Sequence, residues 1–208
     1  MCSLSWQIPR TGRRCGGPLL PGSFAADYHS RMSDEQPRAS RQTLQPVDDD
    51  ALMLAARLLR TSGHGALAVL EAGTGHPLAS RAGFACDAQG APILLISGLA
   101  AHTPALRADP RCSLLAGEPG AGDPLAHPRI TLIGRARCLV RGSPEGELAR
   151  ACYLAVHRKA ALYADFPDFD FWRIEPQRAS LNGGFGRAWL LSQDDLVRAF
   201  ARPQSGAA

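Results

Sequence analysis

Apolar and polar positions alternate along most of the chain, and the period of the alternation changes from helical to strand-like. The helical part begins at Asp48-Asp49-Asp50, where acidic side chains favour the positive end of a helix dipole, and its apolar positions up to Arg60 share one face. Beyond Gly63 the period becomes strand-like. Short apolar runs separated by Gly, Pro and Asp turns predict five strands, at 66–70, 78–86, 92–97, 111–116 and 129–140. The short links between the first three predict an antiparallel meander.

A second helix follows the fifth strand. Ser143-Pro144-Glu145 is a capping residue followed by proline, which is a common way to begin a helix. The apolar positions Leu148, Cys152 and Ala155 are predicted to face inward from this helix.

The C-terminal part predicts two further strands, at 169–175 and 179–191, with Pro176 separating them, and a terminal helix at 193–201. Gly134 is a predicted bulge in the long fifth strand. About seven mostly antiparallel strands and four helices predict a mainly β fold, a closed or split β-barrel with its helices packed outside.

The chain divides into three parts by composition. Residues 1–45 carry Pro, Gly, Ser and Arg without periodicity and are predicted to be disordered. Residues 46–192 form the barrel domain, and residues 193–208 a short helix with a frayed tail. Met32 opens an ordinary N-terminal sequence, so we expect translation to begin there and residues 1–31 not to be made natively; the intact mass of the natively expressed protein tests this.

The composition narrows the class of protein. Hydrophobic residues make up 45% and charged residues 20%, which is typical of globular proteins. The net charge is +4 and comes almost entirely from arginine, without a dense basic run between aromatics, so no nucleic-acid partner is expected. No apolar run reaches the ~18 residues of a membrane span, and no signal-peptide pattern opens the chain. These features predict a cytoplasmic protein with no membrane partner.

The six cysteines lie far apart and form no C-x-x-C pair. This spacing indicates neither a zinc site nor a disulfide framework, so we expect buried thiols in a reducing compartment and no bound metal.

The segment 94–110 carries the most suggestive chemistry. A strand ends at Ser97, a link of small residues follows, and His102 and Thr103 stand directly before Pro104. Thr followed by Pro predicts a helix that Thr103 caps, and the free N–H groups at its start can hold a phosphate. The alternative is an ordinary strand–loop–helix connection.

Five stretches occur in the order typical of one superfamily: HGALAVL at 64–70, PLASRAGFACDAQGAPILLIS at 77–97, LAAHTPALRADPRCSLL at 99–115, GDPLAHPRITLIGRA at 122–136 and FWRIEPQRASLNGGFGRAW at 171–189. Together they resemble the FMN-binding split-barrel superfamily typified by pyridoxamine 5′-phosphate oxidase. Within it they are most similar to the branch of haem-utilisation proteins. The resemblance covers roughly residues 47–190 and implies a six- to seven-stranded antiparallel split barrel.

The resemblance also implies a set of cofactor-binding residues. Arg81 matches the arginine that points at the FMN phosphate, and Ser97 matches the hydroxyl residue that ends the next strand. His102 and Thr103 fall at the phosphate and ribityl contacts of the following helix. Arg129 matches a polar position that reaches the flavin across a dimer interface.

The function implied is that of an FMN-dependent oxidoreductase, a homodimer with flavin at its interface and a small-molecule substrate. No residue stands out as a general acid or base. No lysine follows Arg81, and the residues that bind pyridoxal phosphate are not reproduced, so vitamin B6 oxidation is not expected.

Two alternatives stay open: a haem-binding or haem-degrading protein on the same barrel, and a module that holds flavin without turnover. For the first, the possible axial ligands are His64, His76, His127 and His157. The segment 183–186, Gly-Gly-Phe-Gly, lacks the context of a phosphate loop and is predicted to be a bend, with Phe185 against the flavin or a partner subunit.

Overall fold

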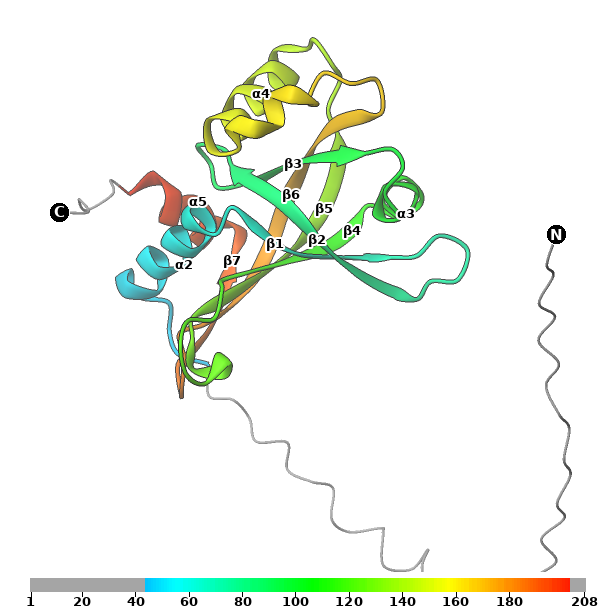
Figure 1. Cartoon of the computed structure of the whole chain (residues 1–208). Coiled ribbons are helices and arrows are strands. Elements are labelled where there is room, and N and C mark those ends of the chain that lie inside the picture. The colour runs from blue at the N-terminus through cyan, green and yellow to red at the C-terminus, as the bar shows by residue number, and fades with distance from the viewer. Residues whose placement is uncertain (1–43, 203–208) are drawn as a thin grey trace, which may run out of the picture. The chain divides into compact units, whose positions relative to one another are not determined.

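The computed structural model describes residues 44–202, so the predictions for residues 1–43 and 203–208 fall outside the described residues. Seven antiparallel strands form one sheet: β1 (His64–Leu70), β2 (Pro77–Cys86), β3 (Pro92–Ser97), β4 (Arg111–Ala116), β5 (Arg129–Cys138), β6 (Phe169–Asn182) and β7 (Ala188–Ser192). Their order is β3-β2-β1-β4-β5-β6-β7, and β3 also pairs with β6. That additional pairing closes six strands into a barrel, with β7 added outside it (Figure 1), which confirms the predicted split-barrel class.

The helices of the described residues lie outside the barrel (Figure 1). They are α2 (Asp49–Thr61), α3 (His102–Ala108), α4 (Pro144–Val156) and α5 (Gln193–Ala201), with short 3₁₀ turns η1 (Pro124–Ala126) and η2 (Arg158–Leu162). The carboxylate of Asp48 caps α2 by accepting from the Ala51 N–H, and Ser192 with Asp195 forms a capping box at the start of α5. No helix among residues 44–202 is long and apolar enough to cross a membrane.

Two clusters of buried apolar side chains hold these elements together. The larger one fills the barrel and joins it to α2 and α5, with Phe84 and Trp189 among its largest side chains. The smaller one lies under α4 and includes Ile93, Leu139 and Tyr153. Complete burial of one such side chain stabilises the fold by about 1.5–3 kcal/mol, so these contacts supply most of the energy that fixes the barrel.

Strand β6 continues through Pro176, so the predicted break at that proline is wrong. Gly134 of β5 pairs with Pro176, whereas the preceding Ile133 pairs with Arg178, so Gln177 has no partner in β5. The predicted bulge at Gly134 is therefore confirmed. Because a bulge interrupts the regular ladder, a residue without an N–H fits there, and the strand runs on past it.

Helix α4 begins as predicted, with the Ser143 Oγ accepting from the Gly146 N–H at 3.1 Å. Of its predicted inward face, Cys152 is confirmed, since it packs against the smaller cluster, but Leu148 and Ala155 are wrong. Leu148 is 72% exposed and Ala155 is exposed, whereas Ala149 and Tyr153 are buried. The Tyr153 ring packs against the barrel, and this larger contact sets the rotation of the helix.

Candidate functional site

The barrel is split beside strand β2. Residues 77–83 of β2 pair with β1, but only residues 84–86 pair with β3. On its other side β3 pairs with β6 along residues 93–97, and it then leads into α3. Among the residues that the structure describes, the segment 77–83 therefore has no strand on its second side, and this free edge leaves backbone groups open to a ligand.

Neighbouring side chains of β2 point to opposite faces at this edge. Ser80 pairs with Leu67, which is fully buried, whereas Arg81 pairs with Ala66, which is exposed. Because side chains alternate along a strand, Ser80 lies on the barrel side of β2 and Arg81 on the outer side.

A hollow of about 450 Å³ lies on the outer side of β1, β2 and β4. Its lining consists mostly of small or apolar residues: Gly65, Ala66, Ala79, Ser80, Arg81, Leu115, Gly117, Glu118 and Pro119. Within residues 44–202, the Arg81 guanidinium forms no hydrogen bond and has no carboxylate within 4.0 Å. The hollow thus joins small and apolar residues to the free Arg81 cation and to the Glu118 carboxylate, which lies 3.0 Å from the His64 Nε2. The apolar surface and the Arg81 cation fit a flat ligand with an acidic group.

On the barrel side, Ser80 contacts the first residue of α3. The Ser80 Oγ and the His102 Nδ1 lie 2.9 Å apart, and the ring is half-buried. Burial lowers the pKa of His102 from its ordinary value, so the imidazole is neutral at pH 7. No described residue hydrogen-bonds its Nε2.

Helix α3 starts differently from the prediction. It begins at His102 with Ala101 as its N-cap, and Thr103 lies inside the first turn. The Thr103 side chain is buried and its Oγ1 donates to the Ser97 carbonyl at 2.6 Å, so it does not cap the helix. The Ser97 Oγ in turn donates to the Asp168 carboxylate at 2.9 Å. Both hydroxyls are thus engaged within the chain, and the Ser97 hydroxyl lies beside the negative charge of Asp168.

Arg129 begins β5 and lies on the same outer side as Thr131, because the intervening Ile130 is buried. Its guanidinium donates to the carbonyls of Leu125 at 3.0 Å and His127 at 3.3 Å. This anchors the loop before the strand.

The structure therefore divides the five predicted residues into two groups. Arg81 and Arg129 share the outer side of the sheet, whereas Ser97, His102 and Thr103 gather where β3 passes into α3. Within one chain these groups do not form a single anion seat, and their contact with a flavin stays a prediction.

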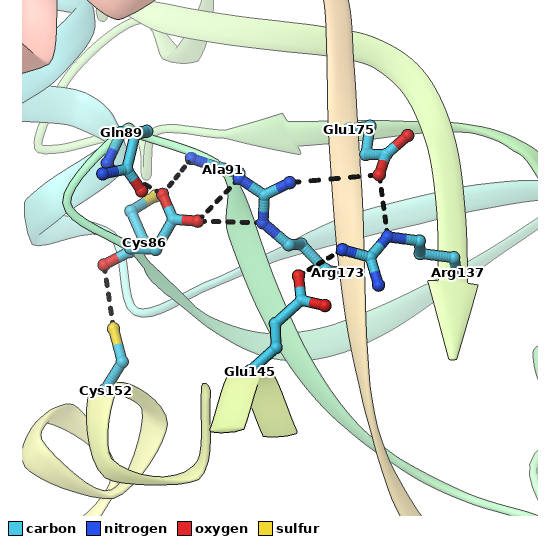
Figure 2. Close-up of polar contacts among 9 residues, drawn as sticks. Cys86, Gln89, Ala91, Arg137, Glu145, Cys152, Arg173 and Glu175 are labelled. Carbon is cyan, nitrogen blue, oxygen red and sulfur yellow. Dashed lines mark hydrogen bonds and ion pairs between the residues drawn. The ribbon is translucent and has the colours of Figure 1, made fainter. Parts of the chain in front are cut away.

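A network of ion pairs that the sequence analysis did not find connects α4 to the barrel (Figure 2). Arg173 of β6 binds Asp87 at 2.9 Å, and both side chains are about one-fifth exposed, at 22% and 19%. Arg137 of β5 binds Glu175 at 2.7 Å and also pairs with Glu145 in the first turn of α4. Two of these pairs join residues 38 and 86 positions apart in the sequence, so no local signal predicts the network.

A second hollow, of about 500 Å³, lies beside this network. Its charged lining residues are Asp87, Glu145 and Arg173, and all three are paired within the chain. Compared with the Arg81 hollow, it offers no free charge to a ligand.

The four cysteines among residues 44–202 supply no nucleophile. Cys86, Cys112, Cys138 and Cys152 are free thiols, and the Cys152 Sγ donates to the Cys86 carbonyl at 3.0 Å (Figure 2). Burial strongly raises the pKa of Cys86 and raises the pKa of Cys112 to about 11. These thiols therefore stay protonated at neutral pH.

The histidines proposed as axial ligands are mostly engaged within the chain. The Nε2 of His157 bonds the Phe84 carbonyl at 2.8 Å, and that of His127 bonds the Ala121 carbonyl at 3.0 Å. The His64 Nε2 lies 3.0 Å from the Glu118 carboxylate. His76 is exposed in the turn between β1 and β2.

The Gly-Gly-Phe-Gly segment at 183–186 connects β6 to β7, which confirms the predicted bend. Phe185 at its tip is fully exposed. Its contact with a flavin or a partner subunit stays a prediction.

The chain is similar to known proteins both in sequence and in fold. The profile of the pyridoxamine 5′-phosphate oxidase family matches residues 54–183. The chloroplastic noncanonical heme oxygenase HOZ of Arabidopsis thaliana is 44% identical over 117 residues, which are 56% of this chain and 35% of that protein. The chain thus spans about a third of the length of this relative.

Solved structures agree with the fold. A structure described as a heme binding protein from Mycobacterium smegmatis is 33% identical, with a TM-score of 0.67, over 74% of this chain and 62% of that one. The heme storage protein HutZ of Vibrio cholerae is 21% identical, with a TM-score of 0.50, over 65% of this chain and 94% of that one. At this identity HutZ supports the fold alone.

Proposed function

The chain belongs to the pyridoxamine 5′-phosphate oxidase family, and on this premise we propose that it binds haem at the split of its barrel, beside strand β2. Two relatives at 33% identity or more support haem as the ligand, since one is named a heme oxygenase and the other a heme binding protein.

The free guanidinium of Arg81 is the observation that carries this proposal. Haem is a flat apolar ring with two carboxylates at its rim, so its site needs an apolar surface and a cation beside it. Ala66, Ala79 and Leu115 supply small and apolar contacts in the hollow that Arg81 borders. A guanidinium pairs with a carboxylate through two parallel hydrogen bonds, which orients the ring as well as holding it.

FMN is the second candidate ligand, and the same features favour it. It also joins a flat ring to an anion, and Arg81 can bind its phosphate as well as a carboxylate. The engagement of Ser97 with Asp168 weighs against it, because a carboxylate beside the proposed phosphate seat repels a dianion. A protein that holds flavin without converting a substrate would be the non-catalytic version of this second candidate.

We extend the proposal to oxidoreductase activity, following the name of the Arabidopsis relative. The protein then supplies binding, orientation and exclusion of water, while the bound cofactor supplies the electron chemistry.

We also propose that a second copy of the chain covers the outer side of the sheet. Its residues there include an uncharged row across β1, β4, β5, β6 and β7, consisting of Ala66, Leu115, Thr131, Ser180 and Leu190. Leu115 and Leu190 are 39% and 50% exposed, and a homodimer would bury them beside the ligand. Light scattering that gives twice the chain mass supports this, and a monomer at micromolar concentration contradicts it.

Titration with haem and with FMN tests the ligand. We expect a saturable Soret band with a Kd below about 10 µM, and a Kd at least about tenfold higher for Arg81→Ala. Arg57→Ala, which removes an exposed arginine of α2, is the matched control and should bind haem normally. Saturable quenching of FMN fluorescence without a Soret band would favour the second candidate. Failure to bind either ligand would contradict both.

A further inference from the structure

We propose that Glu118 is a specificity-determining residue of the hollow beside Arg81, and that His64 positions its carboxylate. In this role Glu118 favours a ligand whose acidic groups all lie on one edge, because that edge can face Arg81 and stay away from Glu118. The inference rests on the proposed haem binding and goes beyond it by assigning the residues that orient and select the ligand.

Arg81 and Glu118 line the same hollow from different sides. Ala66 of β1 pairs with Arg81 of β2 and with Leu115 of β4, so the three residues form a row across the sheet. Neighbouring strands lie about 4.8 Å apart, which places the backbones of Arg81 and Leu115 about 10 Å from each other. Glu118 follows Leu115 beyond the end of β4, and no arginine among residues 44–202 lies within 4.0 Å of its carboxylate. The hollow is therefore positive on its β2 side and negative at the end of β4.

The contact with His64 holds the carboxylate of Glu118. The His64 Nε2 lies 3.0 Å from the Glu118 Oε1, and an ionised carboxylate can only accept, so Nε2 carries the hydrogen of this contact. His64 lies two residues before Ala66 in β1 and on the same outer face, because the intervening Gly65 is buried. The Glu118 side chain is 56% exposed. A contact with a strand residue therefore keeps an otherwise solvent-exposed carboxylate at the hollow.

The two charges together favour one orientation of the ligand. Both carboxylates of haem lie on one edge, so that edge can meet Arg81 while the opposite hydrocarbon edge lies toward Glu118. A ring turned the other way brings its carboxylates to Glu118. Two like charges about 4 Å apart weaken binding about fivefold even at the dielectric constant of water, and more where the ring excludes water. A porphyrin with carboxylates on opposite edges meets this repulsion in either orientation.

Titration of the full chain with two iron porphyrins tests the specificity role. Haem carries two carboxylates on one edge, and iron coproporphyrin III carries two more in place of the vinyl groups on the opposite side. At low salt we expect the wild-type chain to bind haem at least about tenfold more tightly than iron coproporphyrin III. Glu118→Gln should reduce this ratio at least about fivefold, chiefly by tightening the binding of the four-carboxylate porphyrin. Glu147→Gln, at an exposed glutamate of α4, is the matched control and should leave the ratio unchanged.

Replacement of His64 tests the positioning role. His64→Ala removes the contact that holds the carboxylate, so the ratio of the two affinities should fall. His64→Gln keeps an N–H that can donate to Glu118, and it should restore the ratio. A purely structural role of either residue would weaken the binding of both porphyrins equally and leave their ratio unchanged.

The outcomes separate the two proposals. A wild-type chain that binds haem but shows the same ratio as folded Glu118→Gln, or binds the two porphyrins equally, would overturn the role of Glu118 and leave haem binding intact. A wild-type chain that binds neither porphyrin would overturn both proposals. Should Glu118→Gln fail to fold, the wild-type ratio decides, since added salt should reduce it by screening the repulsion, and an unchanged ratio at about 500 mM salt would overturn the role of Glu118.

Discussion

The arginines of this barrel differ in whether a carboxylate of the chain is paired with them. Arg173 and Arg137 are paired with the carboxylates of Asp87, Glu175 and Glu145, and the Arg137–Glu145 pair fastens α4 to the sheet (Figure 2). Arg81 extends from the free edge of β2 without a partner among residues 44–202. Paired charges hold the fold, whereas a free charge beside an apolar hollow is available to a ligand. The two regions should therefore respond differently to substitution.

The largest effect is expected at the paired arginines. Arg173→Ala leaves the Asp87 carboxylate largely buried without its cation, and we expect a loss of about 3 kcal/mol in the free energy of unfolding. Urea unfolding measures this loss. The haem affinity of the folded fraction should stay unchanged. A large loss of haem affinity with little loss of stability would contradict the assignment of Arg173 to the fold and not to the ligand.

Arg81→Glu is expected to act on binding alone. A carboxylate at this position repels the acidic rim of the ligand, so we expect about a 30-fold loss of affinity, or about 2 kcal/mol. The free energy of unfolding should change by less than about 0.5 kcal/mol, because the substitution breaks no described contact. Absorption titration and urea unfolding of the same preparation measure both quantities. If Arg81→Glu unfolded the protein, Arg81 would belong with Arg137 and Arg173, the arginines that stabilise the fold.

The pH dependence of stability distinguishes the buried side of the β2 edge from its outer side. Burial lowers the pKa of His102 below its ordinary value of 6.5, so the unfolded chain takes up a proton before the folded chain does. The free energy of unfolding is therefore highest above pH 6.5, where the ring is neutral in both states. It decreases as the pH falls from there through the lower pKa that His102 has in the folded chain. We expect His102→Asn to reduce this slope in thermal unfolding scans between pH 7.5 and 5. An unchanged slope would mean that the ring is not desolvated.

The smallest effect is expected at Leu148, on the exposed face of α4. Because this side chain is 72% exposed, Leu148→Ser should change the free energy of unfolding by less than about 0.5 kcal/mol. Ala149→Ser, at the neighbouring buried position, should cost more, since it places a hydroxyl against the barrel. Equal effects of the two in urea unfolding would contradict the observed rotation of α4.

The sequence predicts the strands well because alternation and turn residues are local signals. The strands at 92–97 and 111–116 coincide with β3 and β4. The course of β6 could not be predicted from Pro176 alone, since the bulge that accommodates it depends on Gly134 in another strand. The rotation of α4 likewise depends on tertiary packing of Tyr153, which outweighs the apolar pattern of the helix.

The candidate site was predicted in part. The family resemblance pointed to Arg81, and the helix start at 102–104 pointed to His102, but strand alternation in the folded register places Arg81 on the outer face of β2 and the Ser80–His102 contact on the barrel side. Thr103 and Ser97 carry the right chemistry for a phosphate, yet tertiary contacts with a carbonyl and with Asp168 engage both. Such long-range contacts leave no signal in the local sequence.

A crystal structure of the haem-loaded protein tests the central claim most directly. It should show the ring at the free edge of β2, with a carboxylate of the ligand on Arg81 and the ring plane against the hollow that Ala66 and Leu115 line. Haem bound elsewhere, with Arg81 still in solvent, would contradict the account.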